Sequence, residues 1–186
     1  MSSLLLAGPA AEPITLAEAK HFIRVEHADD DDVITALIAG ARIHVEAATR
    51  RALMTQSWRV IRDCWPESGR LALLPVPLAS IDAARVRKQD GSTLAIDVAS
   101  FTIDKAAVPA TVAFTAPSAP ERAVGGIEID ITCGYGGAED VPEPLRQAIR
   151  MLVAHWYENR GLVSGEVAML PASAAALIAP YRVLGL

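Results

Sequence analysis

Basic residues and long apolar runs are scarce in this 186-residue chain, and each scarcity excludes a class of protein. The 17 Lys and Arg are outnumbered by 22 Asp and Glu, so the net charge is -5. An excess of acidic residues argues against a basic surface that binds nucleic-acid phosphates tightly. It does not exclude the transient passage of DNA past an acidic surface. No apolar stretch reaches the roughly 18 residues of a transmembrane helix, so no membrane association is expected.

Cysteine is also rare, which argues against a disulfide framework or a zinc site. Cys64 and Cys133 lie far apart, with no CxxC pair and no His at zinc-finger spacing. We expect two buried free thiols rather than a disulfide. The start of the chain contains Leu4-Leu5-Leu6 but no basic region and no long apolar region, so it does not resemble a signal peptide. We therefore expect synthesis in the cytoplasm.

Apolar residues, by contrast, are plentiful enough for a globular fold. Hydrophobic residues make up 52% of the chain and charged residues 21%, a composition typical of ordered proteins. The length suits a single domain over residues 1–186.

Periodic patterns predict helices at both ends of the chain. Thr15 and Glu18 have the spacing of a capping box and predict a helix over residues 16–25. An apolar stripe with helical spacing predicts a second helix from about residue 33 to residue 49. A third, long helix is expected after Pro142 and Pro144, which suit a first helical turn, and should end near residue 160.

The middle of the chain alternates as strands do. The clearest alternation covers residues 126–134, where three Ile residues and Cys133 take turns with polar residues. Other strands are expected at residues 55–64, 71–74, 100–104 and 111–115, and a hairpin at 81–96 turns at Asp90-Gly91. Helices followed by strands and a further helix predict an α+β fold with a mostly antiparallel sheet.

No pattern of reactive residues predicts catalysis or a cofactor. The run of four Asp at residues 29–32 lacks the alternation of a calcium loop and suits the N-terminus of a helix. None of the four His has the spacing of a zinc hydrolase. Glycines at residues 134–137 favour a strand-to-helix turn over a phosphate cradle. A nucleophilic pair assembled in space from a Cys and a His remains an alternative.

The C-terminal segment is apolar and has no patterned core of its own. Residues 162–170 are unpatterned and contain Gly, residues 172–179 suit a short helix, and residues 180–186 are expected to be extended. On physical grounds alone, this tail either packs back on its own subunit or inserts into a neighbouring protein.

Several segments together resemble the head-tail connector, or neck adaptor, proteins of tailed bacteriophages and gene transfer agents. The resemblance spans nearly the whole chain and depends on the joint order of its segments. These segments are Ile14–Lys20, Leu53–Trp58, Leu73–Leu78, Cys133–Gly136, Val141–Ile149, His155–Arg160 and Pro180–Arg182.

The resemblance implies a structural role in a virion or phage-like particle, without enzymatic activity, cofactor or metal. Copies would form a homo-oligomeric ring, expected to be twelve-fold, between the portal protein and the next neck or tail-completion protein, and DNA would pass through it. Residues 1–52 and 138–161 would form a helical ring body, residues 53–137 an antiparallel β-rich insertion, and residues 162–186 an extended tail that docks on the portal.

The resemblance also directs attention to two sets of residues. Insertion of the tail into the portal would use Leu170, Leu177, Ile178, Tyr181, Arg182, Val183 and Leu184. Because a ring needs two different complementary patches on each subunit, we expect ring contacts on polar helix faces that carry Arg42, Glu46, Arg146 and Arg150. The alternatives are another phage tail-completion or interaction module and a Cys-dependent hydrolase.

Overall fold

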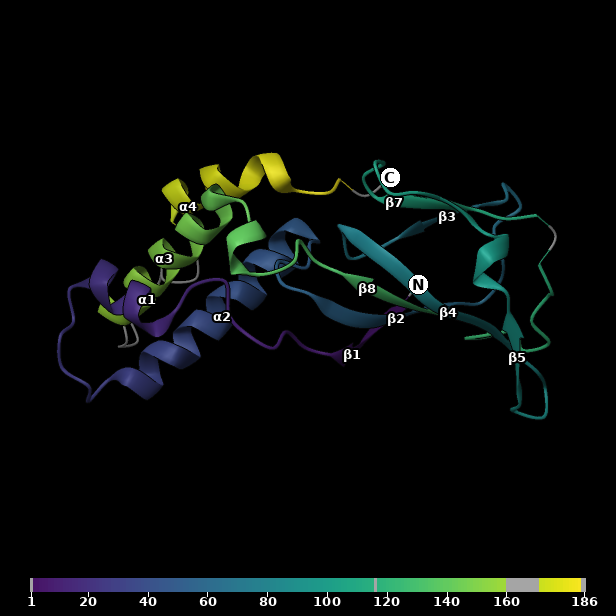
Figure 1. Cartoon of the computed structure of the whole chain (residues 1–186), viewed down its shortest axis with the longest axis horizontal. Helices are drawn as coiled ribbons and strands as arrows, with labels where there is room; N and C mark the ends of the chain where they lie inside the picture. The colour runs from purple at the N-terminus through teal and green to yellow at the C-terminus, as the bar shows by residue number, and fades with distance from the viewer. Residues whose placement is uncertain (1, 116, 160–170, 185–186) are drawn as a thin grey trace. The chain divides into compact units, whose positions relative to one another are not determined.

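The chain folds as two compact units (Figure 1), and the computed structural model describes residues 2–115, 117–159 and 171–184. The β unit comprises Met1–Ala10 and Thr55–Tyr135, and the helical unit comprises Ala11–Met54 and Gly136–Leu186. Helices and antiparallel strands together confirm the predicted α+β class. None of the described helices has the length and apolar character needed to cross a membrane.

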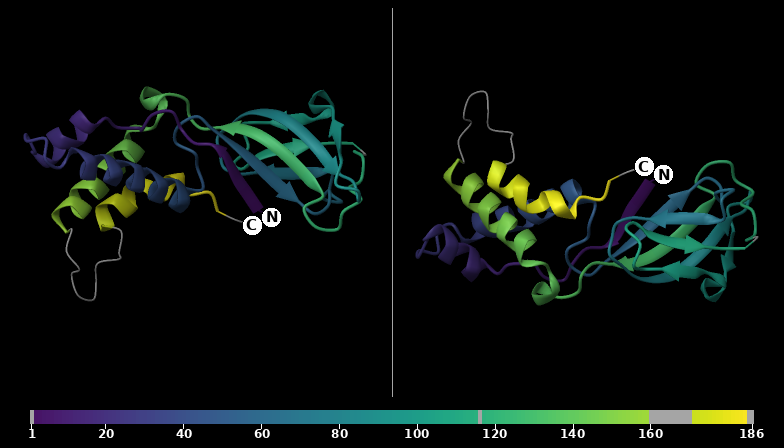
Figure 2. Two further views of the ribbon diagram at one scale, coloured as in Figure 1. Left: turned by 90° about the horizontal axis from the view of Figure 1, so that it is seen from below. Right: turned by 90° about the horizontal axis from the view of Figure 1, so that it is seen from above.

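The described part of the helical unit contains four α-helices. They are α1 (Leu16–Ile23), α2 (Asp31–Thr49), α3 (Glu143–Glu158) and α4 (Ala172–Ile178). A 3-10 turn at Ala179–Tyr181 follows α4 and occupies the beginning of the segment expected to be extended. Figure 2 shows α4 lying along α3, and α2 also packs against α3.

The capping box before α1 forms as predicted. The backbone amide of Glu18 donates to Thr15 Oγ1 at 3.1 Å, and the Glu18 carboxylate accepts from the backbone amide of Thr15 at 2.7 Å. Two amide donors that the first turn leaves without an intrahelical partner are thus satisfied, which fixes the start of α1.

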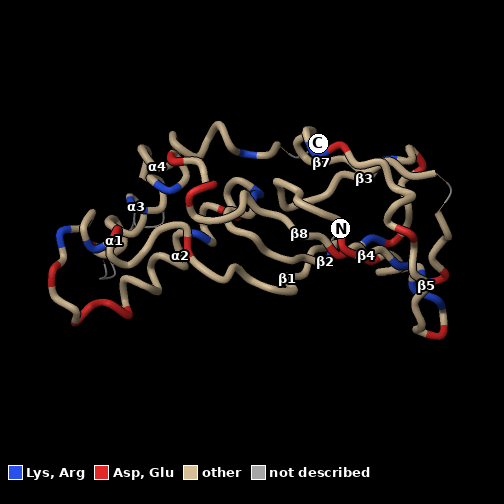
Figure 3. The backbone as a smooth tube through the Cα atoms, viewed as in Figure 1, with Lys and Arg blue, Asp and Glu red and all other residues tan. Residues whose placement is uncertain are grey.

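The acidic residues at the start of α2 (Figure 3) have two separate roles. Asp31 and Asp32 lie in the first turn of α2, where negative charge interacts favourably with the helix dipole, as expected. Asp30 takes the N-cap position but makes no side-chain cap; its carboxylate accepts a hydrogen bond of 2.6 Å from the Tyr157 hydroxyl instead. This residue therefore links the start of α2 to the end of α3.

The apolar stripe of α3 supplies much of the helical core. Leu145, Ala148, Ile149, Leu152 and Val153 are all buried, as their spacing predicts. Each fully buried Leu or Ile contributes about 2 kcal/mol of hydrophobic stabilisation. Helix α2 contributes Ile34, Ile38 and Val45 to buried positions, and α4 contributes Ala174 and Ile178.

The β unit is a sandwich of two antiparallel sheets. The larger has the order β1-β2-β8-β4-β5 and the smaller has the order β3-β7-β6. Their strands are β1 (Ser2–Ala7), β2 (Gln56–Arg62), β3 (Arg70–Leu73), β4 (Leu78–Arg87), β5 (Thr93–Ile96), β6 (Thr102–Asp104), β7 (Ala110–Ala113) and β8 (Ile127–Cys133).

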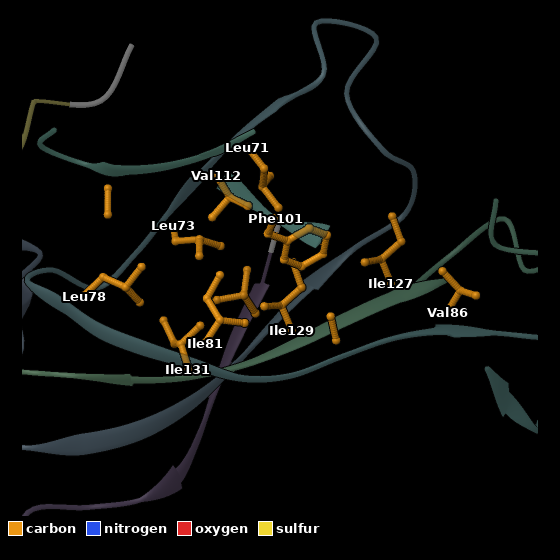
Figure 4. Packing of buried hydrophobic residues seen from close by; sticks show 13 residues of the cluster. Leu71, Leu73, Leu78, Ile81, Val86, Phe101, Val112, Ile127, Ile129 and Ile131 are labelled. Carbon is orange, nitrogen blue, oxygen red and sulfur yellow. The ribbon is translucent and has the colours of Figure 1, made fainter. Parts of the chain in front are cut away.

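The core of the sandwich lies between these sheets (Figure 4). The pairing of β8 with β2 and β4 aligns Ile129 with Val60 and Ala84 on one face, because directly paired residues point the same way. Leu73 and Val112 of the smaller sheet pack in the same cluster. The alternation predicted for residues 126–134 is therefore confirmed, with Cys133 buried as expected.

Two local expectations were incomplete or wrong. The apolar start of the chain, predicted only to lack a targeting signal, forms strand β1 and pairs with β2. Cys64 was expected to be buried but is exposed, because β2 ends at Arg62 and the cysteine falls in the following loop. Both cysteines are free thiols, as predicted.

The other face of the larger sheet carries an ionic network. Arg59 of β2 donates to Asp130 of β8 at 2.7 Å, and Arg85 of β4 donates to both Asp130 and Glu128 at 2.7 Å. Arg87 also donates to Glu128, at 2.6 Å. Three cations thus share two carboxylates across three neighbouring strands, which ties β2 and β4 to β8.

The network lowers the pKa of both carboxyl groups. Burial raises the pKa of Glu128, but hydrogen bonds from Arg85 and Arg87 outweigh it, so the pKa falls below the ordinary value of 4.5. The hydrogen bond from Arg59 is the largest cause of a pKa below 3.8 at Asp130. A carboxyl group whose pKa is lower in the folded state stabilises the fold above its unfolded pKa and loses that contribution as pH falls through its folded pKa.

We therefore predict that Glu128→Gln reduces the acid sensitivity of the β unit. Wild-type stability should fall steadily as the pH drops below about 4.5, and the variant, which has one titrating partner fewer, should show a shallower fall. Urea unfolding followed by tryptophan fluorescence across this range measures the difference. Glu67→Gln, at an exposed position, is the matched control and should keep the wild-type slope; identical slopes for all three proteins would contradict the assignment.

Candidate functional site

Arg42 of α2, a predicted ring-contact residue, is only 8% exposed. Its Nε donates to Glu12 at 2.8 Å and its Nη1 donates to Glu46 at 2.8 Å. Burial lowers the pKa of Arg42, but the two carboxylates outweigh it and raise this pKa further above its ordinary value. Glu46 also accepts from the backbone amide of Leu53 at 2.8 Å. The cluster therefore joins α2 to the segments that precede α1 and follow α2.

Arg146 and Arg150 of α3 are likewise paired inside the helical unit. Arg146 donates to Glu18 at 2.8 Å and to the carbonyl oxygen of Pro13 at 3.0 Å, and Arg150 reaches Glu18 at 3.4 Å. The backbone amide of Thr15 is the largest cause of a lowered pKa at Glu18, and both arginines lower it further. These contacts hold α1 on α3.

The structure thus places all four predicted ring-contact residues in intramolecular ion pairs. Arg42 and Glu46 pair with one another, whereas Arg146 and Arg150 share Glu18 and Glu143. Their participation in contacts between subunits stays a prediction. What the geometry establishes is their role in fixing the helical unit itself.

The C-terminal tail packs on its own helical unit over the described part of its length. Ile178 and Val183 are buried, and the amide of Val183 donates to the carbonyl oxygen of Thr49 at 3.0 Å. Arg51 of the same unit donates to the carbonyl oxygen of Tyr181 at 2.7 Å. Of the two arrangements left open by the sequence, this segment adopts self-packing.

The remaining predicted docking residues differ in exposure. Leu177 and Tyr181 are half-buried, whereas Arg182 is exposed and donates to the carbonyl oxygen of Ala48 at 3.3 Å. Leu184 is 83% exposed, the highest value among the large hydrophobic residues described. Leu170 lies outside the described residues. Docking on a partner stays a prediction for the whole set.

The Cys and His residues of the alternative nucleophilic pair lie in different units. All four His belong to the helical unit and both Cys to the β unit, so neither unit by itself holds a Cys-His pair. The buried thiol of Cys133 donates to the carbonyl oxygen of Gln56 at 3.8 Å. Within the described ranges, no three His, Cys, Asp or Glu side chains come together as a metal site.

The glycine turn after β8 also has an internal partner. The Asp140 carboxylate accepts from the backbone amide of Gly137 at 2.9 Å, so this amide is already used by a group of the sign that a phosphate would have. Gly134 and Gly136 have φ values of 122° and 133°, where L side chains are strained. The cluster is a strand-to-helix turn, as predicted.

Comparison with known proteins supplies the functional context for this architecture. A family model of the phage gp6-like head-tail connector proteins matches residues 13–76. A chain from the neck of the native gene transfer agent (GTA) particle, computed with C12 symmetry, is 26% identical, with a TM-score of 0.80, and the match covers 100% of this chain and 97% of that chain. The chain is therefore similar to head-tail connector proteins over residues 13–76 by the family model and over its whole length by fold.

Two further structures share this fold at the same coverage, 100% of this chain and 97% of the other. A chain of the native GTA virion is 23% identical with a TM-score of 0.83, and a chain from the neck of the empty GTA particle, computed with C6 symmetry, is 22% identical with a TM-score of 0.82. No curated protein matches the chain. The predicted resemblance to head-tail connectors is confirmed.

Arg42→Ala provides a direct test of the ion pairs in the helical unit. We predict that the substitution lowers the free energy of unfolding by about 3 kcal/mol, because it leaves Glu12 and Glu46 close together without their cation. Urea unfolding followed by far-ultraviolet circular dichroism measures the change. Arg122→Ala, which removes an exposed arginine, should change stability by less than about 0.5 kcal/mol. Equal stability of the two variants would show that the Arg42 pairs contribute nothing.

Proposed function

We propose that this chain is a structural connector subunit in the neck of a phage-like particle, where copies of it form a ring between the head and the tail. The observation that carries the proposal is the match to GTA neck chains over 100% of this chain and 97% of theirs, at TM-scores of 0.80 and 0.82. The structural match extends over both the helical unit and the β unit, whereas the family model matches residues 13–76 alone.

Symmetry supports a ring of identical copies. The two neck structures were computed with C6 and C12 symmetry, and a closed ring brings each subunit against two neighbours through two different surfaces. We propose a twelve-fold ring with α2 and α3 in its body. The ion pairs of Arg42, Arg146 and Arg150 would then hold these helices in position while their outer surfaces meet the neighbouring copies.

The charge distribution suits a passage for DNA. The chain has a net charge of -5, and three arginines of the β unit, Arg59, Arg85 and Arg87, pair with Glu128 and Asp130. A channel that bound phosphates tightly would retain the DNA, because each neutralised phosphate adds to the affinity. An acidic ring is compatible with DNA that moves through without specific binding.

The tail is the proposed portal contact. Burial of Ile178 and Val183 anchors it on the helical unit. The exposed Leu184 and Arg182 and the half-buried Leu177 and Tyr181 are then available to a partner. A prearranged tail loses less conformational entropy on docking than a disordered one. The next neck or tail-completion protein would bind another surface of the ring.

We predict that the full chain, mixed with the portal protein of its own particle, forms closed rings attached to the portal. Negative-stain microscopy and co-sedimentation measure assembly and attachment. Leu184→Asp should weaken attachment at least tenfold, because it places a charge in an apolar contact, and should leave stability unchanged because Leu184 is exposed.

Leu94→Asp is the matched control, since Leu94 is an exposed leucine of the β unit. Its attachment to the portal should equal that of the wild type. A wild-type chain that remains monomeric in the presence of the portal protein would contradict the connector role. Undiminished attachment of Leu184→Asp would contradict only the placement of the portal contact.

A further inference from the structure

Strand β1 is an edge strand without the protection that edge strands usually have. On one side it pairs with β2, where Ser2 lies opposite Ile61 and Leu5 lies opposite Trp58. On the other side it has no neighbouring strand among the described residues, because β1 is the first strand in the order of the sheet. All six residues of β1 are exposed. Monomeric proteins shield such edges with charges, proline or a covering segment, and β1 has neither charge nor proline (Figure 3).

The leucines of β1 are exposed on both faces of the strand. Leu4 aligns with Arg59 and Leu5 aligns with Trp58, so these two leucines point to opposite faces. Leu4, Leu5 and Leu6 are 54%, 45% and 44% exposed. Three adjacent leucines in a bare strand would promote indiscriminate association, unless the assembled state covers them.

The helical unit has an uncharged surface of its own on α2. Val33 and Ile43 are 41% and 56% exposed, and the exposed Ala36 and Ala47 lie on the same side of the helix by their spacing. Between residues 33 and 49, the only Lys, Arg, Asp or Glu residues are Arg42 and Glu46, which pair with one another. After its first turn, where Asp32 is also exposed, the outer face of this long helix is therefore mainly apolar, with the exposed His44 beside it.

These two surfaces differ in shape and share their apolar character, which is what a head-to-tail ring contact requires. We propose that β1 of one copy packs against the uncharged outer face of α2 in the neighbouring copy. This proposal rests on the proposed ring and adds its contact residues. We assign the contact to a second copy of this chain because the similar neck structures were computed with C6 and C12 symmetry. Contact between the two surfaces would also bury no charged side chain that lacks an ionic partner.

Substitution of each surface tests the contact in the full-length protein. Leu5→Ser and Ile43→Ser should each raise the concentration of half-maximal ring assembly about tenfold, since each removes apolar area from the contact. Mass photometry measures assembly, and thermal unfolding checks that each variant folds. Leu94→Ser and Val124→Ser, at other exposed apolar positions, should assemble like the wild type.

The double variant Leu5→Ser/Ile43→Ser tests whether the two surfaces meet each other. Substitutions of two residues that contact each other have non-additive effects. Two independent tenfold increases in the concentration of half-maximal assembly would multiply to about a hundredfold increase. The double variant should show a clearly smaller increase than that. A full product of the two losses would overturn the pairing of β1 with α2.

Cross-linking tests whether β1 of one copy contacts α2 of a neighbouring copy. In a Cys64→Ser background, differently tagged Leu5→Cys and Ile43→Cys chains should join through a short bismaleimide when rings form, whereas Leu5→Cys and Val124→Cys chains should not. Rings that form without this cross-link, or that assemble normally with Leu5→Ser and Ile43→Ser, would overturn this inference alone. Failure of the wild-type chain to form rings would overturn the proposed function as well.

Discussion

The pairing of β8 on both of its edges is the constraint on which the β unit depends. Because side chains alternate along a strand, the register that buries Ile127, Ile129 and Ile131 also places Glu128 and Asp130 on the opposite face. A slip of one residue would bury the carboxylates and expose the isoleucines. The arginines of β2 and β4 reinforce the same register, so hydrophobic packing and electrostatics specify a single arrangement.

The helical unit is fixed by a different combination of forces. Its apolar stripe alone would allow the helices some freedom, but Arg42 and Arg146 connect α2 and α3 to segments elsewhere in the sequence through charge-assisted hydrogen bonds. The tail then covers part of this unit through Ile178 and Val183. Both units are therefore internally ordered, as a subunit that presents fixed surfaces to identical neighbours should be.

Local signals in the sequence predicted much of this fold, but partners distant in the chain escaped them. The capping box at Thr15, the stripe of α3 and the alternation of β8 are each encoded within a few residues. Strand β1 is stabilised by pairing with β2, whose residues lie 50 to 59 positions further along the chain, and its three consecutive leucines show no alternation with polar residues. The ionic partners of Arg42 and Arg146, such as Glu12 and Pro13, are equally invisible to periodicity. The exposed surfaces of β1 and α2 became evident only once burial was known.

The most direct test of the connector role is a cryo-electron microscopy reconstruction of the neck from particles that contain this chain. The account predicts a closed ring of identical subunits between head and tail, each subunit containing the helical unit and the β sandwich described above. A neck whose ring is built from other proteins, with this chain absent or located elsewhere in the particle, would contradict it.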